Sequence, residues 1–216
     1  SIMALKNNTW KLNQWYDQSV AGNVSYTGQQ QLWVWGYNEY GNLGQNSHGN
    51  SISSPTQIPG TNWSSNFHSY AAANEKANIL AKTDGTLWTW GQNEKGQGGQ
   101  NNTVAYSSPV QVPGTTWSFT SRGNKMSAAV KTDGTLWMWG DATAGGLGQN
   151  DTTQRSSPVQ IPGTTWSKCY ISVNGAFAFK TDGTLWGWGR GSNGILAQNN
   201  TTEYSSPVQI DGNWSH

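Results

Sequence analysis

The nine residues TDGTLWTWG, which begin at Thr83, combine an aspartate with two threonines that flank its Asp-Gly pair and with two tryptophans. Related stretches begin at Thr27, Thr132 and Thr181, the first of them degraded to TGQQQLWVWG. A carboxylate can act as a general base when it lies within hydrogen-bond reach of a substrate proton. An Asp-Gly pair is also a strong signal for a tight hairpin. We therefore interpret the repeated aspartates, Asp84, Asp133 and Asp182, as turn residues and not as catalytic groups.

The other reactive side chains form no catalytic pattern. His48, His68 and His216 are far apart and none recurs at the repeat spacing. No zinc-ligand spacing is present, and no pair of carboxylates suits glycoside cleavage. The single cysteine, Cys169, excludes an internal disulfide framework, and we interpret it as a small buried residue. The sequence predicts a protein that is not an enzyme, with no catalytic residue, no metal site and no cofactor.

Composition excludes further classes. The 216 residues carry a formal charge of +1, and only 11% of them are charged, so no basic field suits a nucleic acid. No apolar run approaches the ~20 residues of a membrane span. The 14 tryptophans argue against disorder. Residues 1–2 precede Met3 and resemble an expression remnant. The compartment is left open, with a virion or an extracellular setting as the expectation.

Two markers repeat with the same spacing. The second tryptophan of WxWG lies at positions 35, 90, 139 and 188, in steps of 55, 49 and 49 residues. The proline of SSP lies at positions 55, 109, 158 and 207, in steps of 54, 49 and 49. Repeats of this length are typical of stacked architectures. The sequence predicts one domain over 1–216 with four units, at about 10–63, 63–117, 117–166 and 166–214.

One unit shows the expected strands. SAAVKTDGTLWMWG, ending at Gly140, holds two apolar runs around Asp133-Gly134, which predicts a hairpin with a two-residue type I′ turn. On the second strand Trp137 and Trp139 share one face, and Leu136 and Met138 share the other. Both faces are apolar and must be covered. We expect about four short antiparallel strands in each unit, with the units stacked face to face.

These motifs resemble the regulator-of-chromosome-condensation repeat. The matching residues are Trp88 to Gly91, Ala128 to Trp137, Gly145 to Gln149 and Pro158 to Ile161. The resemblance implies an all-β β-propeller, although family members typically have seven blades. The Asn- and Trp-rich style resembles repeat proteins of marine bacteriophages and some bacteria. We expect four four-stranded antiparallel blades per chain, closed as a four-bladed ring or as an eight-bladed homodimer.

Comparison of the four units separates scaffold from surface. The WxWG tryptophans, the SSP prolines and a glutamine (Gln45, Gln100, Gln149 and Gln198) are the same in every unit. The loop after WG and the residue before SSP differ. These varied positions are the predicted binding residues: Tyr37, Tyr40, Lys95, Tyr106, Asp141, Arg155, Arg190 and Tyr204. Exposed tyrosine and arginine suit a protein or glycan partner, and we expect a phage virion or adhesion component.

Two alternatives come from the resemblance. The family's founder promotes guanine-nucleotide exchange, which depends on an insertion outside the blades; the longest unit here exceeds the shortest by only six residues. A plant ultraviolet-B receptor of the family uses tryptophans beside arginines, and none of Arg122, Arg155 and Arg190 directly flanks a tryptophan. The last unit drifts from the pattern at residues 195–197, which suggests a terminal repeat with a different neighbour.

Overall fold

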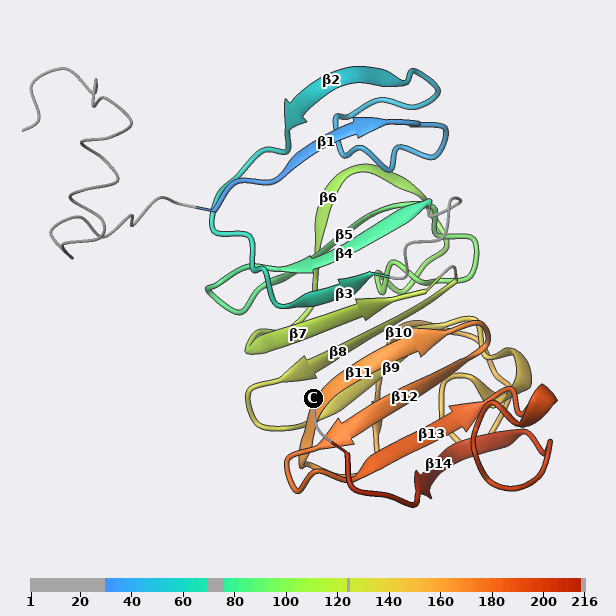
Figure 1. Ribbon diagram of the computed structural model, residues 1–216. Coiled ribbons are helices and arrows are strands. Elements are labelled where there is room, and N and C mark those ends of the chain that lie inside the picture. The colour runs from blue at the N-terminus through green and yellow to red at the C-terminus, as the bar shows by residue number, and fades with distance from the viewer. Residues whose placement is uncertain (1–29, 70–75, 124, 215–216) are drawn as a thin grey trace, which may run out of the picture.

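The computed structural model describes residues 30–69, 76–123 and 125–214. Over these residues the chain is built from short strands and two 3₁₀ turns (Figure 1). The strands are β1 (Trp33–Gly36), β2 (Ile52–Gln57), β3 (Phe67–Ser69), β4 (Ala77–Ala81), β5 (Leu87–Gly91), β6 (Tyr106–Val112), β7 (Trp117–Arg122), β8 (Met126–Lys131), β9 (Leu136–Gly140), β10 (Arg155–Ile161), β11 (Trp166–Ser172), β12 (Gly175–Lys180), β13 (Leu185–Gly189) and β14 (Tyr204–Ile210). The turns are η1 (Thr143–Gly145) and η2 (Ser192–Gly194).

The third and fourth units are the four-stranded antiparallel blades that the sequence predicts. Strands β7, β8, β9 and β10 pair in chain order to form blade 3, and β11, β12, β13 and β14 do the same in blade 4. Blade 1 contributes β1 and β2, and the first part of its unit lies outside the described residues. The 49-residue period therefore corresponds to one blade.

Blade 2 departs from this plan in its first strand. Strands β4, β5 and β6 pair antiparallel, but β3 pairs in parallel with β7 of blade 3. The Asn66 side chain supports this pairing by donating to the Ser118 carbonyl at 2.6 Å. The cause lies in chain length, because Lys82 follows Trp63 by 19 residues whereas Lys131 follows Trp117 by 14. The longer connection lets β3 leave its own blade and join the next one.

The hydrophobic core lies between the blades, as the two apolar faces of each unit predict. Leu136 and Met138 of blade 3 belong to one cluster with Trp166 and Trp188 of blade 4. On the opposite face of blade 3, Trp139 packs into a second cluster with Ile79, Ala81, Leu87 and Val112 of blade 2. A third cluster joins blades 1 and 2. Each blade is therefore stabilised by its neighbours, because one sheet alone cannot cover both faces.

The hairpin turns differ from the predicted type I′ form. In the turn Thr83-Asp84-Gly85 the glycine has positive φ (81°), and Asp84 does not. The Gly85 amide donates to the Lys82 carbonyl and the Lys82 amide to the Thr86 carbonyl, which is a three-residue loop with glycine in the left-handed position. The Asp84 carboxylate accepts from the Thr86 amide at 2.9 Å and from its hydroxyl at 2.6 Å. The aspartates are turn residues, as predicted.

The described blades do not close into a ring. Figure 1 places β1 and β2 at one end of the molecule and β13 and β14 at the other. Within the described residues no strand pairs blade 1 with blade 4. The consequence is visible in the WxWG tryptophans: Trp35 of blade 1 is 61% exposed, whereas Trp90, Trp139 and Trp188 are 3%, 0% and 0% exposed. The expected four-bladed ring within one chain is absent from the described structure.

Candidate functional site

The strand register brings the predicted binding residues to one edge of the blades. Gly91 pairs with Tyr106, Gly140 with Arg155 and Gly189 with Tyr204. The WG loop of each blade thus leaves and returns at the same edge, which we call the WG rim. It comprises the loops 37–51, 92–105, 141–154 and 190–203 and the first residues of β6, β10 and β14. All eight predicted residues lie on this rim.

The WG loops of blades 1 and 2 are fixed by a buried asparagine. Asn93 is 2% exposed; its oxygen accepts from the Gly98 amide at 2.7 Å and its nitrogen donates to the Asn102 and Val104 carbonyls. Asn38 holds the loop of blade 1 in the same way, through Leu43 and Ser47. Blades 3 and 4 carry alanine and glycine at this position and form η1 and η2 in their loops.

Three of the eight residues hold their own loops. Tyr106 accepts a hydrogen bond from the Asn102 amide at 3.1 Å, and Tyr204 accepts one from Asn200 at 3.0 Å. At the equivalent position Arg155 pairs with Asp151 at 2.7 Å. The pKa of Asp151 is lowered mainly by the hydrogen bond from the Thr153 backbone amide and to a smaller extent by Arg155. From blade to blade, the residue before SSP therefore changes together with its partner four positions earlier. This indicates that Tyr106, Arg155 and Tyr204 stabilise their own loops, in addition to any role in binding.

The other five are Tyr37, Tyr40, Lys95, Asp141 and Arg190, and their side chains differ in chemistry. Tyr37 is 61% exposed, and its hydroxyl donates to the Glu39 carboxylate. Lys95 is half-buried. Asp141 caps its own turn by accepting from the Thr143 amide. Arg190 is exposed and donates to the Ser192 hydroxyl at 2.7 Å. Together they place phenol, ammonium, carboxylate and guanidinium groups along the rim.

Contacts between neighbouring blades complete the rim. Lys76 of blade 2 donates to the Tyr40 hydroxyl of blade 1 at 2.9 Å and lies over its ring. Lys125 of blade 3 pairs with Glu94 of blade 2 at 3.1 Å, which lowers the pKa of Glu94. The comparison of the four units missed Lys76, Glu94 and Lys125, although Lys76 and Lys125 share one repeat position, seven residues before Thr83 and Thr132.

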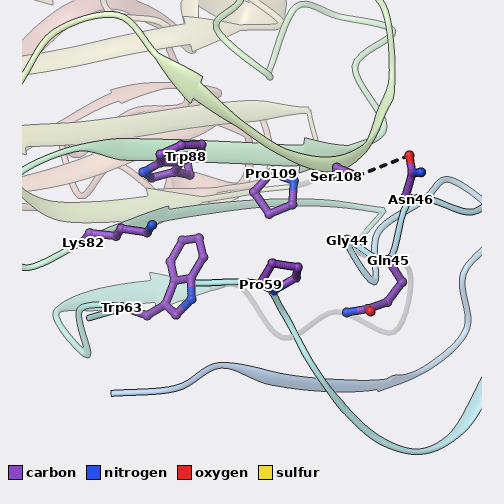
Figure 2. Close-up of a pocket in the computed structure, with 9 residues that line it drawn as sticks. All are labelled: Gly44, Gln45, Asn46, Pro59, Trp63, Lys82, Trp88, Ser108 and Pro109. Carbon is purple, nitrogen blue, oxygen red and sulfur yellow. Dashed lines mark hydrogen bonds between the residues drawn. The ribbon is translucent and has the colours of Figure 1, made fainter. Parts of the chain in front are cut away.

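A second repeated cluster was also missed, and its lysines precede the TDG hairpin turns. Lys82, Lys131 and Lys180 each place the ammonium over two tryptophan rings, at distances of 4.2 to 4.9 Å. In blade 2 the pair is Trp63 and Trp88. Figure 2 shows this lysine and both rings in a pocket of about 330 Å³, which Gln45, Pro59 and Pro109 also line. The first tryptophan of WxWG thus packs within its own blade, whereas the second packs between blades.

The described residues contain no arrangement for metal or thiol chemistry. No group of three or more His, Cys, Asp or Glu side chains gathers among them. Cys169 is free and fully buried, and burial raises the pKa of its thiol, so it is the small core residue that the sequence predicts. In the same described part of the chain, no helix has the length and apolar character that a membrane crossing requires.

Comparison with known proteins identifies the family. The model of the regulator of chromosome condensation (RCC1) repeat matches residues 29–72, 84–130, 133–171 and 182–215. The four matched segments cover most of the chain, which therefore belongs to the RCC1 repeat family. A comparison with curated protein sequences gives no match.

Solved structures share the fold at low sequence identity. Human WBSCR16 superposes with a TM-score of 0.73 at 20% identity, over 86% of this chain and 50% of that one. Prp20p from Saccharomyces cerevisiae gives 0.68 at 16% identity, over 84% and 46%. Prp20 in its complex with Kap60 gives 0.67 at 17% identity, over 85% and 45%. The chain thus spans about half the length of these RCC1-like structures.

Proposed function

We propose that this chain is a non-enzymatic binding module that contacts a protein or glycan partner through the WG rim. The observation that carries the proposal is the segregation of residues. The repeated tryptophans and glutamines build the blades, whereas the eight varied residues share one edge. A rigid scaffold with varied loops at one edge is a common arrangement for recognition.

The binding partners of a protein with the same fold are the first candidates to test. The structure of Prp20p was described together with its binding to Gsp1p and histones, and we propose that a protein partner is the better choice for this chain too. The low charge of the chain and its Asn- and Trp-rich composition also support a place in a phage particle or an adhesin, where the partner is an envelope glycan.

The test compares the two edges of the blades. Binding of Gsp1p, histones and purified envelope glycans is measured by biolayer interferometry with the full chain. A triple variant, Tyr37→Ala with Lys95→Ala and Arg190→Ala, removes three rim side chains. Thr164→Ala is the matched control, because Thr164 is exposed and lies beside the Gly134 turn at the opposite edge.

Loss of binding in the triple variant, with the control unchanged, is the expected result. Binding that survives the triple variant would place the contact elsewhere on the chain. Failure of every probe to bind at high micromolar protein would count against the proposal. Guanine-nucleotide exchange on a panel of small GTPases, measured in the same series, tests the exchange alternative directly.

A further inference from the structure

The three junctions between neighbouring blades use one repeated hydrogen bond. The indole nitrogen of Trp90 donates to the Asn42 carbonyl of blade 1 at 3.0 Å. Trp139 donates to Gln97 of blade 2 at 2.9 Å, and Trp188 donates to Gly146 of blade 3 at 3.1 Å. In each case the second WxWG tryptophan of one blade is seated in the WG loop of the blade before it.

The SSP strand of each following blade supplies the rest of the junction. The backbone amides of Asn46, Asn101 and Asn150 donate to the carbonyls of Ser107, Ser156 and Ser205 at 2.7 to 2.8 Å. The next serine donates from its hydroxyl to the same asparagine side chain, as Ser157 does to Asn101 at 3.3 Å and Ser206 does to Asn150 at 3.2 Å. A junction therefore joins one loop to one tryptophan and one serine pair.

Blade 1 presents the tryptophan and serine half of this junction to solvent. Trp35 is 61% exposed. Ser53 and Ser54 are also exposed, and they occupy the positions of the serines that pair at the other junctions. The tryptophan and the two serines that form each of the three internal junctions thus have exposed counterparts in blade 1.

Blade 4 presents the loop half. Its turn keeps the shape of the others, because Ala197 donates its amide to Gly194 as Gly148 does to Gly145, and Asn199 has φ 54° where Asn150 has 59°. Among the described residues no serine lies against Gly194, whereas a Cβ on Gly145 would meet Ser205 at 2.5 Å. An open surface lies there instead, lined by Asn193, Gly194, Ala197, Asn199, Asn200 and Thr201. In the other three loops the following blade covers the equivalent surface.

One residue distinguishes this loop from the other three. A Cβ on Gly44, Gly99 or Gly148 would lie 3.1, 2.8 or 2.9 Å from the indole nitrogen of the seated tryptophan. Blade 4 has Ala197 at this position, so a tryptophan seated there must shift by a few tenths of an ångström. Crowding of this kind weakens a contact without abolishing it.

We propose that blade 4 of one chain binds blade 1 of a second copy head to tail, with Trp35 seated in the loop that contains Ala197. The second copy is the partner because it carries the matching half with the spacing that the internal junctions use. The solved relatives extend over about twice the length that this chain covers, so two copies together match one such protein in length. The proposal does not depend on the function of the WG rim.

The test is the mass of the full chain in solution, measured by light scattering over a concentration series. We expect the mass to rise from the 23.5 kDa of one chain toward twice that value or beyond. Trp35→Ala removes the seated ring and is expected to hold the mass at one chain. Ala197→Gly removes the crowding methyl and is expected to tighten association by ~10-fold.

Tyr37→Ala is the matched control, because Tyr37 has the same 61% exposure as Trp35 but lies on the WG rim. It should associate like the wild type, and Trp35→Ala should retain any rim binding, so the two proposals fail separately. Near-ultraviolet circular dichroism checks that each variant is folded. A wild-type mass of one chain at every concentration overturns the proposal, as does association of Trp35→Ala that matches the wild type.

Discussion

At the scale of single residues, charged side chains in this protein act mostly on their own hairpins. The Thr135 hydroxyl and amide both donate to Asp133 and lower its pKa. The Thr86 hydroxyl and amide act in the same way on the pKa of Asp84, and the Thr184 amide and hydroxyl do so on the pKa of Asp182. The aspartate that first suggested chemistry is thus held in its ionised form by the turn that it closes.

This predicts a contribution to acid stability. A carboxyl whose pKa is lowered by folding stabilises the protein above its unfolded pKa, and the contribution is lost as pH falls through the folded value. Replacing all three aspartates with asparagine should therefore lower the free energy of unfolding above ~pH 4 and have little effect below ~pH 3. Urea unfolding from pH 2.5 to 6 measures the gap, and a gap that is constant with pH would contradict the prediction.

The lysines over paired tryptophans give a second prediction. Lys131 lies 4.7 Å from the ring centres of both Trp117 and Trp137. Lys131→Met keeps the aliphatic contact and removes the charge, so it should reduce the free energy of unfolding by ~1 kcal/mol. Lys168→Met is the control, since no cation–π contact involves Lys168 among residues 125–214. Equal losses in urea titrations of the two variants would exclude a cation–π contribution.

At the scale of elements, the WG loops are of two kinds. Those of blades 1 and 2 are held by a buried asparagine, and those of blades 3 and 4 contain a 3₁₀ turn. The role of the asparagine can be tested. Asn93→Ala leaves the Gly98 amide and two carbonyls without their partner, which should cost ~1–3 kcal/mol. Hydrogen exchange at Gly98 should accelerate in this variant. Asn93→Asp keeps the acceptor for Gly98 and should preserve most of that protection. Slow exchange at Gly98 in Asn93→Ala would show that the loop does not depend on the side chain.

The repeated pattern predicted the antiparallel strands of the blades, but it did not predict the three-residue form of the TDG turns. The invariant glutamines are scaffold: Gln45, Gln100, Gln149 and Gln198 each donate to a strand carbonyl at 2.9 to 3.1 Å. The roles of Tyr106, Arg155 and Tyr204 were missed because each depends on a partner four residues earlier. The parallel pairing of β3 could not be predicted, because it results from a longer connection and not from a motif.

At the scale of the whole molecule, stability is expected to vary along the stack. Blade 3 is packed on both faces, whereas the tryptophan face of blade 1 is exposed. In stacked repeats each unit depends on its neighbours, so amides of β8 and β9 should exchange most slowly and those of β1 fastest. Native-state hydrogen exchange of Trp35→Ala at low concentration measures this in single chains. Uniform protection would instead indicate one cooperative unit.

The glycines that contact the seated tryptophans, Gly44, Gly99 and Gly148, also limit which repeat can be duplicated to extend the array. A duplicated copy of blade 2 or blade 3 carries Gly99 or Gly148 and accepts a following blade without change. A duplicated copy of blade 4 would bring Ala197 into the interior of the array, where its methyl group meets an indole ring. Growth of the array by duplication of blade 2 or blade 3 is therefore easier than growth by duplication of blade 4.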